Sequence, residues 1–279
     1  MSDIYLNGRF MPLEQAQVPV MDRGFIFGDG VYEVIPVYDR IPLALERHLD
    51  RLANSLEGVR IPNPLTRTAW KMLIQQLIAR EPEATQSIYL HVTRGVAPRD
   101  HAFPKDTTPT VFAMAKPMAP PPAGWLHQGV KAITHNDFRW LKCHLKTTAL
   151  LANVLLRQMA VEAGAVECLL IREGYLTEGA ASNVLAVVDG VLLAPPRNHL
   201  LLPGITYDLV LEIAARHGIP FEERPVTESE LRRASEIMMT SSTREIVPIT
   251  LLDDQPVGNG LPGPLSKKLL SLYQELKHP

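Results

Sequence analysis

The chain has 279 residues, of which 46% are hydrophobic and 21% charged, and 28 basic against 30 acidic residues leave a formal net charge of −2. This composition is typical of a globular protein of about two domains that can bury a core without disulfide or metal staples. The charge balance argues against a nucleic-acid partner, and no apolar run approaches the roughly 20 residues that span a bilayer.

The first part of the chain predicts a strand, a helix and two more strands. The glycine-rich stretch GDGVY (28–32) leads into a β-branched strand over 31–38. Further on, SIYLHVTRG (87–95) and TVFAMAKP (110–117) predict two more strands of a sheet. Between the first strand and these two, a helix is predicted from four leucines on one stripe: Leu45, Leu49, Leu52 and Leu56.

The strongest break in composition is KPMAPPPAG, residues 116–124. Its prolines fix φ and remove backbone donors, so we expect an extended segment that resists both helix and sheet. The break suggests an N-terminal α/β domain over 1–117, a proline-rich linker over 118–124 and a C-terminal domain over 125–279.

Local signals are clear after the linker. A first helix has Thr147 and Thr148 available as N-terminal caps and Gly164 as its stop. Two hairpins follow, which turn at 173–174 and 189–190, where Glu-Gly and Asp-Gly pairs stand.

The remaining C-terminal stretch alternates helix and strand. A helix is predicted from about 205 to 216, with its stop at Gly218. Thr227 and Glu230 form a capping box that opens another helix, EIMMTSSTREIVPI returns to strand, and PLSKKLLSLYQELK closes as an amphipathic helix. The expected fold class is mixed α/β (α+β) in two domains.

Several common site types find little support. The GDGVY loop leads into a strand, whereas a phosphate-binding glycine loop leads into a helix, so turn glycines are the favoured interpretation. Nine histidines show no HExxH or other ligand spacing, and no GxSxG elbow is present, so we expect no metal site. Cys143 and Cys168 lack CxxC spacing, and the N-terminal residues lack a signal-peptide pattern. We expect free thiols and a cytoplasmic location.

Lys146 directly precedes the first helix after the linker, and a lysine in such a place is usually a solvated charge. Three other features change that interpretation. Glu178 ends a strand, Thr206 lies in the first turn of a helix, where free amides favour phosphate, and hydroxyls end another strand. These hydroxyls belong to Ser241, Ser242 and Thr243. An amine, a carboxylate and a phosphate cradle are the groups that pyridoxal phosphate requires.

Seven motifs spread along the chain carry a family resemblance: GRF, RGFIFGDGVYE, HLDRL, RWLKCHLKTT, LTEGAASNV, LPGITYD and TSSTREIVP. The chain resembles the class IV (fold type IV) pyridoxal-phosphate aminotransferases, and within them it is most similar to the D-amino acid transaminases. The resemblance implies a smaller N-terminal domain, a larger cofactor-binding C-terminal domain, pyridoxal 5′-phosphate between them, and a homodimer.

The resemblance also implies residue roles. Lys146 would bind the cofactor aldehyde as an imine, Glu178 would pair with the pyridine nitrogen, and Tyr32 would lie over the site near the imine. Arg51 flanks the leucine stripe and would be placed at the surface from the sequence alone, but the family pattern assigns it to the phosphate. The other residues that the resemblance assigns to cofactor binding are Ile205, Thr206, Ser241 and Ser242.

The stretch RGVAPRDHAFP (94–104) resembles the carboxylate-binding segment of the D-transaminases. Without that resemblance, Arg99 and His101 would be interpreted as a solvated basic loop. With it, they join Tyr32 in holding the substrate α-carboxylate, since a guanidinium fork fits a carboxylate with two hydrogen bonds. A fixed carboxylate leaves only one enantiomer with its Cα–H directed at Lys146.

Three departures from the family pattern affect substrate range. Ala180 and Ala181 stand where serines are frequent, and Pro36 interrupts a strand that usually lines the substrate pocket. Arg244 replaces a small polar residue. An acidic substrate or the phosphate could be its partner, but we expect a solvated surface charge, which is the commoner environment of arginine.

The implied activity is transamination from a D-amino acid, such as D-alanine, to a 2-oxo acid such as 2-oxoglutarate or pyruvate. Two half-reactions at one site predict ping-pong kinetics. Branched-chain L-amino acid aminotransferase and aminodeoxychorismate lyase are alternatives, since they share the lysine, the glutamate and the phosphate cradle. A third alternative is a non-catalytic pyridoxal-phosphate-binding protein.

Overall fold

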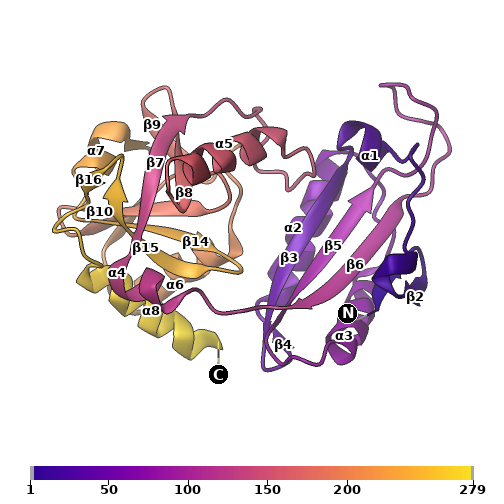
Figure 1. The fold of residues 1–279 in the computed structure, drawn as a ribbon, viewed down its shortest axis with the longest axis horizontal. Helices are drawn as coiled ribbons and strands as arrows, with labels where there is room; N and C mark the ends of the chain where they lie inside the picture. The colour runs from indigo at the N-terminus through magenta and orange to yellow at the C-terminus, as the bar shows by residue number, and fades with distance from the viewer. Residues whose placement is uncertain (1–2, 278–279) are drawn as a thin grey trace. The chain divides into compact units, whose positions relative to one another are not determined.

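The computed structural model describes residues 3–277, and the chain forms two compact units, which Figure 1 shows in indigo to magenta and in rose to yellow. The first unit comprises Met1–Ala119 and Leu145–Leu150, and the second comprises Pro120–His144 and Leu151–Pro279. Both units combine a sheet with helices, so the predicted mixed α/β class is confirmed. The return of residues 145–150 to the first unit has no signal in the sequence.

The first unit is built on a six-stranded antiparallel sheet with the order β2-β1-β6-β5-β3-β4. Its strands are β1 (Ile4–Leu6), β2 (Arg9–Met11), β3 (Gly30–Tyr38), β4 (Ile41–Pro42), β5 (Gln86–Thr93) and β6 (Thr110–Pro117). The three strands predicted in this part of the chain are therefore confirmed as β3, β5 and β6. Its helical segments are η1 (Leu13–Gln15), α1 (Arg23–Phe27), α2 (Leu45–Gly58) and α3 (Arg67–Arg80).

Helices α2 and α3 cover one face of this sheet, as Figure 1 shows. The leucine stripe of α2 contributes Leu49, Leu52 and Leu56 to the core, while Leu45 is only partly buried. Alternate residues of β3 point to the two faces, so Val31, Ile35 and Val37 join this core. The opposite face carries the partly buried rings described below, Tyr32, Tyr89 and Phe112.

Two features of the first unit differ from expectation. Strand β3 runs unbroken through Pro36, which pairs with Ser87 of β5 and accepts a hydrogen bond from the Leu43 amide. The predicted interruption is therefore wrong. Helix α3 was missed, although Thr66 caps it by accepting a hydrogen bond from the Ala69 amide.

The second unit is built on a ten-stranded sheet with the order β12-β11-β10-β14-β15-β7-β8-β9-β13, and β16 also pairs with β15. Its strands are β7 (Val130–Asn136), β8 (Glu167–Arg172), β9 (Tyr175–Gly179), β10 (Asn183–Val188), β11 (Val191–Ala194), β12 (Phe221–Glu223), β13 (Val226–Thr227), β14 (Glu236–Ser241), β15 (Glu245–Leu252) and β16 (Gln255–Pro256). Its helices are α4 (Ala123–Gln128), α5 (Leu151–Glu162), α6 (Ile205–Arg216), α7 (Glu228–Arg232) and α8 (Pro264–Lys277).

Most local predictions for the second unit are confirmed. Both hairpins form, as β8–β9 and β10–β11. Helix α6 has the predicted bounds, and Gly218 follows it with φ of 63°. Gly164 follows α5 with φ of 66°, and the capping box of Thr227 and Glu230 opens α7. The stretch expected to return to strand forms a hairpin, β14–β15, with its turn at 242–244.

Two predictions around the unit boundary are wrong. Thr147 and Thr148 do not cap α5, which begins at Leu151. Thr147 forms a β-bridge with Val31, and the Thr148 hydroxyl donates a 2.9 Å hydrogen bond to the Gly28 carbonyl, so both residues are engaged with the first unit. The proline-rich segment is also less irregular than expected, because β6 extends into it as far as Pro117 and α4 starts within it.

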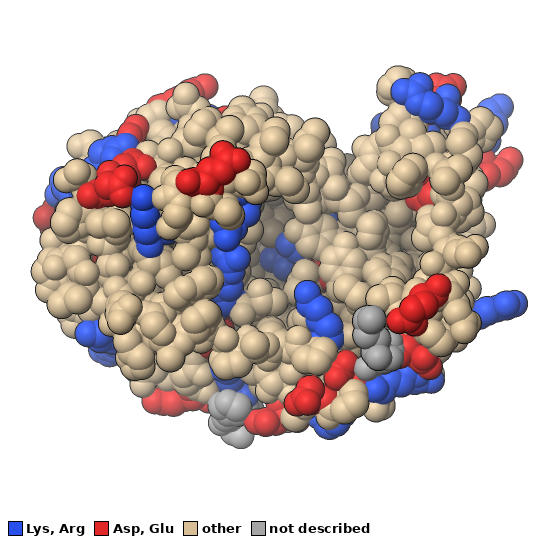
Figure 2. All heavy atoms as spheres, in the orientation of Figure 1, with Lys and Arg blue, Asp and Glu red and all other residues tan. Residues whose placement is uncertain are grey.

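Figure 2 shows basic and acidic side chains scattered singly or in small mixed groups over the face in view, as expected for a net charge of −2. Among residues 3–277, no helix combines the length and the apolar character that crossing a bilayer requires.

Candidate active site

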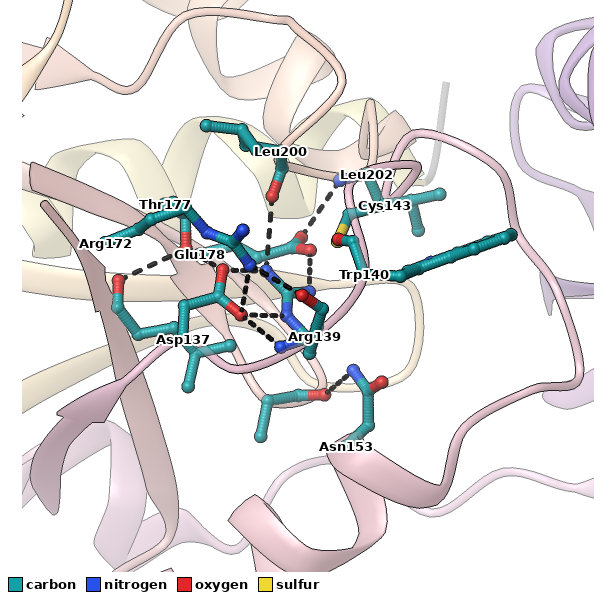
Figure 3. Close-up of polar contacts among 12 residues, drawn as sticks. Asp137, Arg139, Trp140, Cys143, Asn153, Arg172, Thr177, Glu178, Leu200 and Leu202 are labelled. Carbon is teal, nitrogen blue, oxygen red and sulfur yellow. Dashed lines mark hydrogen bonds and ion pairs between the residues drawn. The ribbon is translucent and has the colours of Figure 1, made fainter.

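Glu178 is a buried carboxylate near the end of β9, with 5% of the residue exposed. It accepts hydrogen bonds from Arg139 Nη1 and, at 3.1 Å, from the Leu202 amide, as Figure 3 shows. Asn183 Nδ2 is a third donor at 3.3 Å, and it also donates to the Leu202 carbonyl at 2.8 Å. Glu178 is thus fixed by donors from three separate segments of the second unit.

Asp137 fixes Arg139 in turn. Arg139 Nε and Nη2 donate to the two carboxylate oxygens of Asp137, each at 2.9 Å. Asp137 also accepts from the Thr177 hydroxyl at 3.0 Å and lies 3.1 Å from Arg172 Nη2. Sequence reasoning missed this support, and the signal that could have found it is the spacing of an aspartate two residues before the arginine of the RWLK motif.

Burial and charge act in opposite directions on these carboxylates. Burial raises the pKa of Glu178 to about 7, because the cost of removing its charge from water exceeds the attraction of Arg139. Burial alone would also raise the pKa of Asp137, but hydrogen bonds and charge from Arg139, with Arg172, lower it to about 2. A buried carboxyl group that titrates near neutrality beside a fixed cation is typical of a functional site.

The first turn of α6, where we expect the phosphate, lies in the same unit. Its N-cap is Gly204, which offers no side-chain acceptor, so among the described residues no capping side chain satisfies the backbone amides of this turn. Ile205 and Thr206, the first two helical residues, are buried. A Cβ placed on Gly204 would lie 1.9 Å from Asn183 Oδ1, so only glycine allows this approach to the residue that contacts Glu178.

Hydroxyl groups at the end of β14 complete the polar surroundings. Thr240 pairs with Asn183 of β10, and its Oγ1 is buried and has no hydrogen-bond partner within residues 3–277. Ser241 and Ser242 follow and are partly buried, with Ser241 Oγ accepting from the Arg244 amide at 3.2 Å. A buried hydroxyl without a partner and the amides at a helix N-terminus are both groups that can donate to a phosphate.

Arg244 is not the surface charge that we expected. Its side chain is partly buried, with Cζ 5.6 Å from the centroid of the Trp125 ring. Burial lowers its pKa, and its Nη1 is buried without a hydrogen-bond partner in the described part of the chain. Ala180 is also buried, and its carbonyl accepts from Asn153 Nδ2 at 2.9 Å.

In the first unit, the structure brings Lys146 and Tyr32 together. The Lys146 carbonyl accepts a 3.0 Å hydrogen bond from the Tyr32 amide, and its own amide donates to Ser55 Oγ at 3.1 Å. Lys146 Nζ lies 4.3 Å from the centroid of the Tyr32 ring. Tyr32 in turn packs 5.8 Å from the ring of Tyr89. The Lys146 backbone is therefore fixed, and its partly buried amine lies over an aromatic ring, whereas Lys142 is exposed.

Arg51 is buried, with 7% exposed, which overturns the surface position that its place on the helix suggests. It pairs with the fully buried Glu33, through Nε at 3.1 Å and Nη2 at 2.5 Å. His48 Nδ1 lies 3.5 Å from the same carboxylate. Burial alone would raise the pKa of Glu33, but Arg51 and His48 hold it well below its usual range. The carboxylate therefore stays charged and holds the guanidinium.

Arg99 and His101 lie together in the loop between β5 and β6, and both are exposed. Each contacts the Phe27 ring: the His101 ring centroid lies at 5.3 Å and the Arg99 Cζ at 5.5 Å. Tyr32, which we expected to act with them, lies on β3 beside Tyr89 and Lys146. Arg99 and His101 thus both contact Phe27, whereas Tyr32 contacts Lys146 and Tyr89.

Residues 30–252 match the family model of amino-transferase class IV. The chain belongs to the class IV aminotransferases. It is 40% identical to a D-alanine aminotransferase of Bacillus licheniformis over 97% of this chain and 95% of that protein. It is 37% identical to a D-alanine aminotransferase of Staphylococcus aureus strain MW2 over 99% of this chain and 98% of that protein.

Solved structures of class IV aminotransferases show the same fold. The branched-chain amino acid aminotransferase of Escherichia coli superposes with a TM-score of 0.92 at 27% identity, over 99% of this chain and 94% of that one. A second branched-chain amino acid aminotransferase, solved with pyridoxamine 5′-phosphate, gives a TM-score of 0.91 at 27% identity, over 98% and 93%. The predicted fold type IV architecture and the predicted cofactor, pyridoxal 5′-phosphate, are confirmed.

Proposed function

We propose that this class IV aminotransferase transfers the amino group of a D-amino acid, such as D-alanine, to a 2-oxo acid such as 2-oxoglutarate or pyruvate. The structural observation that carries a transaminase function is Glu178, a buried carboxylate fixed by Arg139 and by the Leu202 amide. The choice of D-amino acids is supported by the similarity to D-alanine aminotransferases over nearly the whole chain.

The chain's residues fit pyridoxal phosphate. Lys146 would hold the aldehyde carbon, and Glu178 would accept a hydrogen bond from the pyridine nitrogen. When bound, the cofactor supplies an electron-withdrawing ring that stabilises negative charge at the substrate Cα. The groups assigned to its phosphate are the amides and side chains of Ile205 and Thr206, the hydroxyls of Ser241 and Ser242, and the Arg51 guanidinium.

Lys146 would serve as the proton-transfer group of the reaction. Its free Nζ would take the proton from the substrate Cα, as a general base does. The resulting ammonium would then deliver that proton to the aldehyde carbon of the cofactor and not back to Cα. The fixed backbone of Lys146 and the Tyr32 ring under Nζ support this role, since they limit the positions that the amine can reach. Two such half-reactions in sequence predict ping-pong kinetics.

Arg99, His101 and Tyr32 would bind the substrate α-carboxylate. The exposed guanidinium and imidazole, side by side on Phe27, offer donors that a carboxylate can accept. With the carboxylate fixed, only one enantiomer would direct its Cα–H toward Lys146, and we assign that place to the D-enantiomer on the similarity to D-alanine aminotransferases.

The surface of the second unit supports a homodimer. Apolar side chains are exposed on α5 and on the loop before it: Phe138, Trp140, Leu141, Leu151, Val154, Leu155 and Val161. Exposed apolar side chains gathered on one helix and the loop before it commonly mark a protein–protein interface, and we assign these to an interface with a second copy of the chain. Light scattering after gel filtration tests this assignment, and a monomer at micromolar concentration would contradict it. A cytoplasmic location is also proposed, since both thiols are unpaired.

The solved branched-chain enzymes support the chief alternative, an L-amino acid aminotransferase. The deciding experiment is initial rates with paired D- and L-alanine, leucine and valine, using 2-oxoglutarate and pyruvate as acceptors. Faster turnover of D-alanine supports the proposal, and faster L-leucine or L-valine overturns it. A lyase would release product without an acceptor. A non-catalytic binding protein would hold the coloured cofactor without responding to any amino donor.

A further inference from the structure

The loop that carries Arg99 and His101 rests on α1, and Arg23 is its main contact there. Only 3% of Arg23 is exposed. Arginine is rarely buried unless its N–H groups have hydrogen-bond acceptors. Helix α1 is held in turn by Asp22, whose side chain accepts from the Gly24 amide at 2.8 Å and from the Thr110 hydroxyl at 2.6 Å. Arg23 is therefore a buried cation on a fixed short helix.

The Arg23 guanidinium donates to three consecutive backbone carbonyls of the loop. Nη1 donates to the carbonyls of Asp100 at 2.5 Å and Ala102 at 3.4 Å. Nη2 donates to the carbonyl of His101 at 3.5 Å. Nε faces the other way and donates to Asp29 Oδ2 at 2.8 Å. One side chain thus fixes the backbone on both sides of His101.

Asp29 anchors Arg23 because a second arginine holds it. Arg94 donates to both oxygens of Asp29, at 2.7 and 2.9 Å, and its other donors reach the carbonyls of Val59 and Arg60, each at 2.8 Å. Burial alone would raise the pKa of Asp29, but the two arginines lower it, so the carboxylate stays charged. The anchor is rigid, since every member has several partners.

Phe27, at the other end of α1, supports the loop side chains. The Cζ atoms of Arg23 and Arg99 lie 4.8 and 5.5 Å from the centroid of its ring, and the His101 ring centroid lies at 5.3 Å. The same short helix therefore fixes the loop backbone through Arg23 and the two exposed side chains through Phe27.

We propose that Arg23 is a positioning residue for substrate, which sets the orientation of Arg99 and His101 and thereby the binding of the substrate α-carboxylate. This inference rests on the carboxylate role assigned to Arg99 and His101 under the proposed function. Ordering an exposed loop costs conformational entropy. A planar guanidinium with several fixed donors holds the loop backbone in one conformation better than a single ammonium does. In Arg23→Lys the ammonium can keep the ion pair with Asp29, but its three N–H groups cannot also donate to all three loop carbonyls.

The test compares D-alanine with D-alaninamide, which has the same side chain and no carboxylate. In the holoenzyme, Arg23→Lys and Phe27→Leu should raise the KM for D-alanine by at least about tenfold and lower the D/L ratio, because misplaced donors bind a carboxylate poorly. The rate with D-alaninamide should change less than about twofold, since no carboxylate contact is lost. Equal losses with both substrates, or an unchanged KM for D-alanine, would overturn the inference.

Two further measurements separate positioning from general damage. Hydrogen–deuterium exchange of the cofactor-free variants should increase in peptides covering 96–109 and stay unchanged in α3, whereas unchanged exchange in 96–109 would count against the inference. Arg67→Lys is the matched control, because this exposed arginine pairs with Glu46 and Asp50 on the surface of the first unit. It should alter neither kinetics nor exchange.

Failure of this inference can be distinguished from failure of the proposed function. If Arg99→Ala impairs D-alanine turnover while the Arg23 and Phe27 variants do not, only the positioning role falls. If the wild-type protein does not prefer D-alanine, the proposed function itself falls.

Discussion

Arg139 contacts Glu178 with the one guanidinium nitrogen that Asp137 does not use. Its Nε and Nη2 bind Asp137 at 2.9 Å each, and its Nη1 donates to Glu178. The arginine is thus oriented by one carboxylate so that it can orient another. In a buried network of this kind, removal of one member leaves the others unpaired, which costs more than a single exposed hydrogen bond.

Glu178→Gln should bind pyridoxal phosphate with nearly wild-type affinity and turn over slowly. A neutral amide does not stabilise a protonated pyridine nitrogen as a carboxylate does, so the loss should appear in kcat more than in cofactor content. Cofactor content by absorbance and kcat with D-alanine check this prediction together. Unchanged kcat in the variant would exclude the role.

The stability of the cofactor-free protein should depend on pH through Glu178. Its pKa rises from an ordinary value of 4.5 to about 7 on folding, so the native state keeps this proton to higher pH than the unfolded chain. The contribution of protonated Glu178 to the free energy of unfolding is complete below the pKa of the unfolded chain and is lost as pH rises through about 7. The Tm difference between wild type and Glu178→Gln should therefore become less favourable to wild type between about pH 5 and pH 8. A constant difference would contradict it.

Lys146→Ala should lose the covalent bond to the cofactor and nearly all transamination, because the amine over the Tyr32 ring is the assigned attachment point. Borohydride reduction followed by peptide mapping should label Lys146 in the wild type. Lys142→Ala serves as the control, since Lys142 is exposed, and it should keep label and activity. Labelling of Lys142 instead would refute the assignment.

Arg99→Ala should lower kcat/KM for D-alanine by about 30- to 1000-fold, or on the order of 2–4 kcal/mol, the range for a charged hydrogen bond that acts in the transition state. The preference for D-alanine over L-alanine should also fall. Initial rates with both enantiomers, for wild type and variant, measure this. An unchanged enantiomer ratio would show that Arg99 does not select the substrate hand.

Gly204→Ala should weaken cofactor binding by about tenfold or more, roughly 1.4 kcal/mol. The new Cβ would collide with Asn183 Oδ1 at 1.9 Å and displace a side chain that contacts Glu178. Gly124→Ala is the matched control, since its Cβ would have only Gln128 Oε1 near, at 3.9 Å, among the described residues. Fluorescence titration of cofactor into both apoproteins gives the two affinities, and equal values would contradict the crowding argument.

The sequence predicted the elements whose signals are local. The turns at 173–174 and 189–190, the stop at Gly218 and the capping box of Thr227 and Glu230 depend on residues within a few positions of one another. Turn and cap chemistry needs no distant partner, so it can be recognised without the fold. Family motifs added the candidate site residues, but the sequence could not show what surrounds them.

Tertiary structure decided the environments of those residues. Arg51 is buried because it forms an ion pair with Glu33. Thr148 caps no helix because its hydroxyl donates a hydrogen bond to the Gly28 carbonyl. Lys146 joins the first unit through Ser55 and Tyr32, both far from it along the chain. Each outcome depends on a partner distant in sequence, and a buried charge or donor is tolerated only where such a partner meets it. The local pattern therefore determined the elements, and long-range pairing determined which polar groups are buried and available for chemistry.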